Sequence, residues 1–246
     1  MYPIYIKELK GFFSSLTGYI VIAVFLTVNS LFMWVFPGEL NVLSGGHATL
    51  DTLFIISPWV FLFLVPAVTM RMISEEKRLG TIELLYSKPV SEMHIVTGKY
   101  LAAVSLVFLA LLPGLVYYAT IWSLGDPQGN LDVGGTAGSV AGLFFLAAVY
   151  AAAGLFASSL TQNQVVAFII AVLISFFLFT GFDSIAMLPG LRNIDEYVVM
   201  LGINEHYRSM SRGVIDISDI VYFVVVITIF IEGTRVVLTS RKWKKG

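Results

Sequence analysis

Six apolar segments, each long enough to cross a lipid bilayer, constrain the fold of this chain more than any other feature. A helix needs about 20 mainly apolar residues to cross roughly 30 Å of hydrocarbon. Hydrophobic residues make up 57% of the sequence, charged residues 13%, and the mean hydropathy is +0.86, which is not typical of a soluble domain. We predict an all-α integral membrane protein, with residues 1–246 forming one transmembrane domain. The six predicted spans lie near residues 18–36, 52–73, 98–124, 135–160, 165–182 and 217–238.

The distribution of basic residues predicts how these spans are oriented. With six crossings, three arginines fall on one side of the membrane and all other Lys and Arg residues fall on or beside the opposite side. The positive-inside rule then places both termini and the loop 74–97 in the cytoplasm. An odd number of spans would destroy this asymmetry. The minority side carries Arg192, Arg208 and Arg212, and the majority side carries Lys7, Lys10, Arg71, Lys77, Arg78, Lys88, Lys99, Arg235, Arg241, Lys242, Lys244 and Lys245.

The long loop 183–216 is predicted to be exoplasmic. It mixes apolar with charged positions, so we expect short helices that fold over the outer end of the bundle or dip into the membrane. Asp216, Ser218 and Asp219 suit the N-terminus of the last span, where an oxygen can cap free amides and negative charge is favoured.

Residues 1–16 have the pattern of an amphipathic helix that lies in the membrane interface. Lys7, Glu8 and Lys10 lie on the polar side. The alternative is the flank of an uncleaved signal anchor. A removable signal peptide is disfavoured, because the apolar run that follows is too long and lacks a small-residue cleavage site. The apolar residues that recur at helical spacing include Tyr5, Leu9, Phe12 and Phe13.

The fourth predicted span carries Gly134, Gly138 and Gly142 at intervals of four residues. Small residues at this spacing let helix backbones approach closely. The stripe therefore predicts close helix packing, either within one subunit or between two subunits.

The stretch 71–100 separates two apolar runs and is the most distinctive part of the sequence. It opens with the charge cluster Glu75, Glu76, Lys77 and Arg78. Gly80 gives a flexible start, Thr81 is a plausible helix cap, and a helix over 81–86 must stop before Pro89. So short a helix is unstable in water alone. It must rest on the ends of the spans or on a second protein, to which the cytoplasmic face would offer the outward-pointing Glu75, Glu76, Lys77 and Glu83. The alternative is a surface loop whose charges are only solvated.

The stretch contains the motifs Glu75-Glu76, Gly80-Thr81-Ile82-Glu83-Leu84-Leu85, Pro89-Val90-Ser91 and Gly98-Lys99. These motifs resemble the signature loop of the ABC-2 family of ATP-binding-cassette transporter permeases. The resemblance implies a coupling helix that docks on a separate ATPase. Three further segments, IKELKGFFSSLTGYIVIAVFL, GLFFLAAVYAAAGLFASSLTQNQVVAF and HYRSMSRGVIDISDIVYF, are similar to the gliding-motility-associated permease subunit of Bacteroidetes-type bacteria.

The sequence contains no energy source of its own. It has no GxxxxGK[ST] phosphate loop, no GxSxG motif and no cysteine, so neither an ATPase site nor a serine-hydrolase or cysteine-based site is expected. The histidines lie in loops or at span edges, and no metal site is expected. At membrane depth the chain offers little besides Asn29 and Glu232, and Glu232 can pair with Arg235. A proton- or sodium-driven transporter usually needs more ionisable groups there.

We therefore expect the membrane subunit of an ABC-2 type exporter in a bacterial inner membrane, without enzymatic activity of its own. The resemblance implies cytoplasmic ATPase subunits that use ATP and Mg²⁺, a second permease copy or a related permease, and a link to gliding motility or secretion. No nucleic-acid partner is expected. The alternatives are an energy-independent scaffold or sensor that docks a cytoplasmic protein, and an intramembrane enzyme. The residues expected to couple to the ATPase are Glu75, Glu76, Gly80, Thr81, Glu83, Leu84, Leu85 and Pro89.

Overall fold

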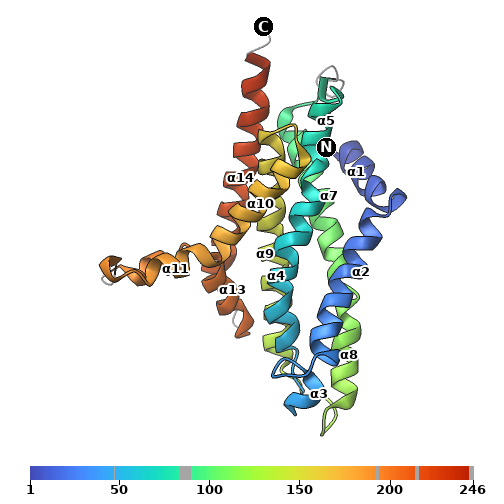
Figure 1. Ribbon diagram of the computed structural model, residues 1–246, viewed down its shortest axis with the longest axis vertical. Coiled ribbons are helices and arrows are strands. Elements are labelled where there is room, and N and C mark those ends of the chain that lie inside the picture. Colours follow the sequence, from blue (N-terminus) through green and yellow to red (C-terminus); the bar gives the residue numbers. More distant parts are fainter. Residues whose placement is uncertain (47, 84–89, 192–193, 214–215, 244–246) are drawn as a thin grey trace.

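The computed structural model describes residues 1–46, 48–83, 90–191, 194–213 and 216–243, and these form helices and turns with no strand. Six helical segments are long and apolar enough to cross a membrane, which confirms the predicted number of spans. Both termini lie at one end of an elongated bundle, here named the terminal end (Figure 1). The six segments are Thr17–Val35, Asp51–Arg78, Glu92–Leu124, Val133–Leu160, Gln164–Ala186 and Ile217–Ser240.

Most spans consist of more than one helical element. The first span joins α2 to a π-helical turn η1, the second joins α4 to α5, the third joins α7 to α8, and the fifth joins α10, η2 and α11. The bounds are α1 Tyr2–Ser14, α2 Thr17–Ser30, η1 Leu31–Val35, α3 Val42–Gly45, α4 Asp51–Thr69, α5 Arg71–Arg78, α7 Glu92–Leu111, α8 Gly114–Leu124, α9 Val133–Leu160, α10 Gln164–Phe176, η2 Phe177–Gly181, α11 Phe182–Ala186, η3 Pro189–Leu191, α12 Asp195–Val199, α13 Ile203–Ser211 and α14 Ile217–Trp243.

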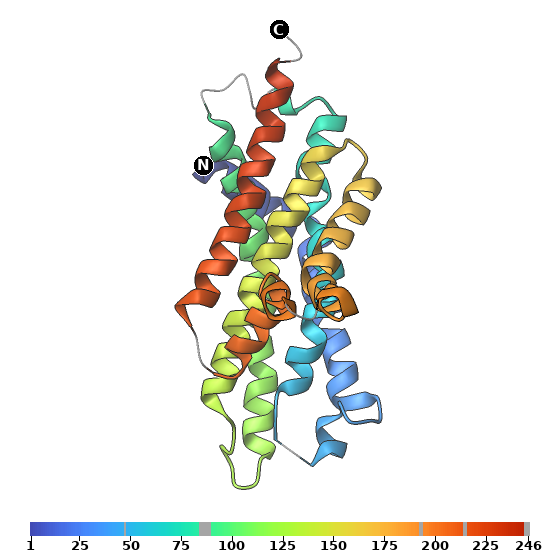
Figure 2. The same cartoon turned by 90° about the vertical axis from the view of Figure 1, so that its left-hand side faces the viewer.

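Helix α9 is the centre of the bundle. It packs against α4, α7, α10, α13 and α14, and Figure 2 shows α14 running beside it. Its sequence is rich in Ala and Gly, so neighbouring helices approach its backbone closely. A Cβ on Gly154, for example, would lie 2.0 Å from Oγ1 of Thr69 on α4.

The glycine stripe of α9 meets α13 of the same chain. A Cβ on Gly138 would lie 2.2 Å from the carbonyl oxygen of Met210, and one on Gly142 would lie 3.1 Å from the ring of Tyr207. Gly134 differs, because its nearest contact would be Asp132 Oδ1 at 3.5 Å. Two of the three glycines thus face a helix within the subunit.

The segment from α11, at the end of the fifth span, to the sixth span forms short helices, as expected, but its described residues do not cover the outer end of the bundle. Helix α11 leaves the bundle sideways, and α13 returns along α9 (Figure 1). The π-helical turn η2 directly before α11 marks the change of direction. Asn204 of α13 donates a hydrogen bond to Asp183 of α11 at 2.7 Å, which holds the two segments together.

The last span starts as its sequence predicts. The Asp216 carboxylate accepts a hydrogen bond from the Ser218 N–H at 3.1 Å. Asp219, in the first turn of α14, instead bonds to a histidine of α13.

The loop after the second span is shorter than predicted. Helix α5 continues α4 to Arg78 and α7 begins at Glu92, so only residues 79–91 connect the two spans. Glu75 and Glu76 therefore lie on a helix and not in a loop. Hydropathy could not show this, because the charged residues that end the apolar run are compatible with a continuing helix.

Candidate functional site

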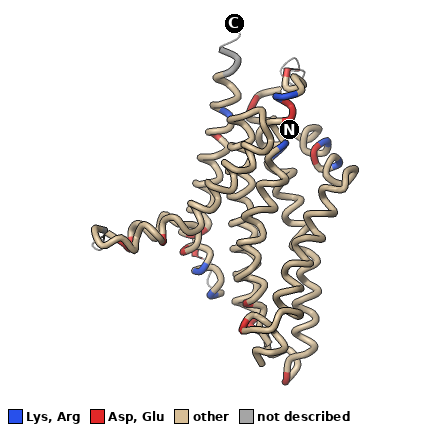
Figure 3. The backbone as a smooth tube through the Cα atoms, in the orientation of Figure 1, with Lys and Arg blue, Asp and Glu red and all other residues tan. Residues whose placement is uncertain are grey.

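Charged residues of α1, α5 and α7 gather at the terminal end of the bundle (Figure 3), and ion pairs connect these helices. These ion pairs join segments far apart in the sequence. We name Lys7, Glu8, Glu76 and Lys99 the ionic cluster.

Lys99 lies at the centre of the ionic cluster, and its side chain is only 1% exposed. Its ammonium contacts Glu8 Oε1 at 2.8 Å, Glu76 Oε1 at 2.9 Å and the Met72 carbonyl oxygen at 2.7 Å. The ammonium donates hydrogen bonds to Glu8 and to the Met72 carbonyl and forms an ion pair with Glu76. A buried charge needs such partners to be tolerated. Through these contacts Lys99 of α7 holds α1 and α5 against α7.

One carboxylate oxygen of Glu76 forms ion pairs with two lysines. Lys7 Nζ lies 3.0 Å from Glu76 Oε1, the same atom that contacts Lys99. The other oxygen, Oε2, is buried without a hydrogen-bond partner among the residues that the structure describes. The carboxylate is thus turned into the protein.

The apolar side of α1 packs on α7 directly beside the ionic cluster. Phe12 is buried, and Tyr5, Leu9 and Phe13 are partly buried. The Tyr5 hydroxyl lies 3.1 Å from Ser105 Oγ of α7. Gly98 permits this approach, since a Cβ there would lie 3.1 Å from the Met1 carbonyl oxygen and 3.2 Å from Ile4 Cβ.

Helix α5 is also tied to the ends of α2 and α9. Ser158 Oγ accepts hydrogen bonds from the N–H groups of Ile73 at 3.1 Å and Ser74 at 3.0 Å, and it donates to the Met70 carbonyl at 2.8 Å. The Lys77 ammonium donates to the Ser159 carbonyl, and the Arg71 guanidinium donates to the Thr17 hydroxyl. A displacement of α5 would therefore alter its contacts with the first and fourth spans.

Two charged side chains that were expected on the surface, Glu76 and Lys77, point into the protein. The side chains of Glu76 and Lys77 are largely buried, whereas Glu75 is 40% exposed and lies 3.9 Å from Arg78. The expectation that Glu76 and Lys77 point outward is wrong, because Lys7, Lys99 and Ser159 offer them partners on the inner side.

The described part of the predicted short helix begins at Gly80. Gly80 has φ of +72°, a left-handed conformation that glycine adopts without strain. Among the described residues, the Thr81 hydroxyl donates to the Glu76 carbonyl at 3.5 Å, and Gly80 O accepts from the Glu83 N–H at 3.2 Å. A cap at Thr81 would involve residue 84, which lies outside the described residues. Glu83 is exposed. Leu84, Leu85 and Pro89 lie outside the described residues.

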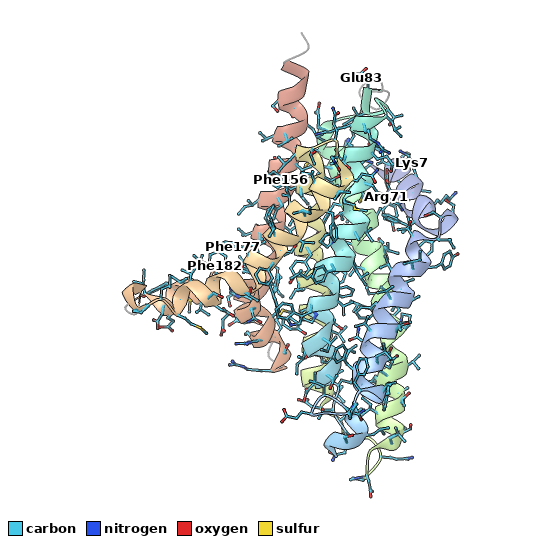
Figure 4. All side chains as sticks on the ribbon, in the orientation of Figure 1. Lys7, Arg71, Glu83, Phe156, Phe177 and Phe182 are labelled. Atoms are coloured by element: carbon cyan, nitrogen blue, oxygen red, sulfur yellow. The ribbon has the colours of Figure 1, made fainter. Side chains whose placement is uncertain are left out.

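A crevice of about 400 Å³ separates α1 from α5 beside the ionic cluster. Figure 4 shows that Lys7 and Arg71 lie close to this region and that Glu83 lies at the tip of the terminal end. The crevice is lined by charged side chains from both helices, including Lys7, Glu8, Arg71, Glu75 and Glu76. It can accept polar or charged groups from a partner on this face.

Sequence reasoning missed the roles of Glu8, Lys99 and Ser158. A usable signal was present for Lys99, which is a cation next to the third apolar run and has carboxylates available at the edges of the first two. Pairing such charges requires knowing which helices are neighbours, and the sequence alone does not provide this.

The direction of the pKa shift of Lys7 predicts how its contribution to stability changes with pH. Partial burial lowers the pKa of this ammonium, but the hydrogen bond to Glu76 and the carboxylates of Glu76 and Glu8 raise it above its ordinary value of 10.5. The stabilisation by Lys7 is therefore complete below pH 10.5 and is lost as the pH rises through the higher folded-state pKa.

We expect the difference in melting temperature between wild type and Lys7→Gln to be constant from about pH 7 to 9 and to shrink above about pH 10.5. Thermal unfolding in detergent at several pH values measures it, with Lys10→Gln at an exposed position of α1 as the control. A difference that grows at high pH would contradict the ion pair with Glu76.

One comparison with known proteins gives a match. Residues 43–201 match the family model described as ABC-2 family transporter protein. The matched region includes the second to fifth spans and the α5–α7 connection, but not α1 or α14. A comparison with curated proteins finds no match.

Proposed function

The chain belongs to the ABC-2 family of transporter proteins, and from this membership we propose that it is the permease subunit of an exporter powered by a separate ATPase. Six spans and the absence of a phosphate-binding loop in the sequence support this proposal. ATP and Mg²⁺ would be held by the ATPase, and this chain would provide the path through the membrane.

We further propose that the terminal end faces the cytoplasm of a bacterium, with the protein in the inner membrane. Most of the basic residues lie in segments at that end, which the positive-inside rule assigns to the cytoplasm. This orientation would present residues 79–91 and the crevice between α1 and α5 to a soluble ATPase.

The observation that carries the proposal is the buried Lys99, because it connects the proposed docking region to the bundle. Residues 79–91 follow α5 directly. Glu76 of α5 bonds to Lys99 of α7, and Lys99 bonds to Glu8 of α1. A push on α5 by an ATPase would pass through these buried ion pairs to α1 and the first span.

The assembly would contain two permease subunits, either two copies of this chain or this chain with a related permease, and two ATPase subunits. Similarity of three segments to the gliding-motility-associated permease of Bacteroidetes-type bacteria supports a role in gliding motility or in secretion. Deletion of the gene in its source bacterium, scored for surface spreading and secretion, tests this role.

Purification of the full chain from its native membranes in mild detergent tests the main proposal. We expect an ATPase with a phosphate loop to copurify. We also expect the double variant Glu83→Ala, Leu84→Ala to weaken its association about tenfold or more, since a few central side chains carry most of the energy of an interface. Glu196→Ala, an exposed glutamate of α12, is the matched control.

Two results would overturn this assignment. One is a preparation in which wild type retains no ATPase. The other is a preparation that retains only a signalling protein without nucleotide hydrolysis, as a scaffold or sensor would.

A further inference from the structure

A histidine of α13 lies between two hydrogen-bond acceptors where α13 meets the last span. His206 Nδ1 is 2.7 Å from Asp219 Oδ1 of α14, and His206 Nε2 is 2.9 Å from the Met200 carbonyl oxygen. A neutral imidazole carries one N–H, whereas an imidazolium carries two. With Asp219 ionised, both contacts are hydrogen bonds only if both ring nitrogens are protonated.

An imidazolium at this position would have an ion-pair partner and an aromatic neighbour. Asp219 is 4% exposed, and its second oxygen has no hydrogen-bond partner in the part of the chain that the structure describes. A buried carboxylate is costly without compensation, and His206 is its ion-pair partner. The Tyr222 ring stacks on the imidazole with centroids 3.8 Å apart, an arrangement that also favours a cation.

The charged and titratable groups on the elements around His206 can be named for the described residues. Asp183 of α11 contacts α13 by accepting a hydrogen bond from Asn204. The elements packed on α13 include α9, α14 and η2. Neither α9 nor η2 contains Asp, Glu, Lys, Arg or His, and the titratable group of α9 is Tyr150. From α14 come Asp219, Tyr222 and, at its start, Asp216. Glu205 and the exposed Arg208 are neighbours on α13, and the exposed Asp195, Glu196 and Tyr197 belong to α12.

We propose that His206 is a protonation-dependent latch, which holds the α12–α13 connection against the start of the last span. With both nitrogens protonated, the ring bridges Met200 and Asp219. Loss of one proton leaves Nδ1–H on the carboxylate and turns the Nε2 lone pair toward the Met200 carbonyl, so this second bond is lost. Because the latched state binds the additional proton, it is favoured at low pH and weakens as the pH rises.

The protonation state can be measured directly, because the chain has three histidines. We expect ¹⁵N NMR of histidine-labelled full chain in nanodiscs to show His206 with two protonated ring nitrogens at pH 6 and to show Nε2 losing its proton first as the pH is raised. His206→Gln assigns the signal. If that variant does not fold, His47→Gln and His94→Gln assign it by subtraction. A single protonated nitrogen on His206 at pH 6 would overturn the proposal.

Hydrogen exchange tests whether the proton controls the latch. After correction for intrinsic rates, protection of residues 200–211 is expected to fall about tenfold as Nε2 deprotonates, the loss expected for one charge-assisted hydrogen bond. In Asp219→Asn this pH-dependent fall in protection should disappear. In the matched control His94→Gln, at an exposed position of α7, the fall in protection should persist. Protection that does not follow the His206 signal would overturn the latch.

Discussion

Replacement of Lys99 by methionine is expected to lower the free energy of unfolding by about 3 kcal/mol, the lower end of the cost of breaking a buried ion pair. The change retains the apolar length of the side chain but removes the cation, so Glu8 and Glu76 lose their strongest partner. The lower end applies because both carboxylates are partly exposed, at 15% and 13%, and Lys7 remains nearby. Unfolding of the purified protein in detergent measures this loss.

Matched variants separate the ionic cluster from general effects of a lysine substitution. Lys10→Met, at an exposed position of α1, should change stability by less than about 0.5 kcal/mol. Adding Glu8→Gln and Glu76→Gln to Lys99→Met should restore part of the loss, because no uncompensated charge then remains. Equal effects of Lys99→Met and Lys10→Met would show that Lys99 does not hold the three helices together.

Replacement of Gly138 by alanine is expected to destabilise the protein by about 1–3 kcal/mol, the usual cost of overpacking. The new methyl group would lie 2.2 Å from the Met210 carbonyl oxygen. The contact is with backbone, so rotation of a side chain cannot relieve it and α13 must shift away from α9. Thermal unfolding and hydrogen exchange of α13 measure the effect.

Gly134→Ala is the matched control, because it lies one helical turn earlier in the same stripe. Its methyl group would have ordinary room, with Asp132 Oδ1 at 3.5 Å. Alanine also favours the helix by up to about 1 kcal/mol relative to glycine, so this variant should be neutral or slightly stabilising. The change in stability caused by Gly142→Ala should lie between those caused by Gly134→Ala and Gly138→Ala. Equal losses at Gly134 and Gly138 would show that the contact with α13 does not determine the effect.

The spans could be predicted from the sequence because a bilayer imposes one strong rule. Every backbone polar group at membrane depth must be bonded within the structure, so long apolar runs become helices wherever they pack. Turn and cap residues such as Asp216 act locally and were predictable for the same reason. The effect of proline on helix continuity was less predictable. Pro58 and Pro66 lie inside α4, whereas the helix of the third span is interrupted before Pro113.

The arrangement of the candidate site depends on contacts between distant segments, and it could not be predicted. Glu8, Glu76 and Lys99 are separated by tens of residues, and only the packing of α1 on α7 brings them together. The stretch 71–100, which the sequence analysis emphasised, contains Glu76 and Lys99 of the ionic cluster. The sequence did not show that Glu76 points inward, because charge alone does not distinguish a surface glutamate from one paired with a buried lysine.

In the proposed mechanism, a separate ATPase binds nucleotide and displaces α5, and the ionic cluster transmits this displacement to α1. The chain has no cysteine, so spin labels at Lys10→Cys on α1 and Val236→Cys on α14, both at exposed positions, report one distance. In nanodiscs with the copurified ATPase, we expect ATP to shift this distance in the wild-type background and to have no effect on the chain alone. An ATPase-bound complex whose distance distribution is the same with and without ATP would contradict the account.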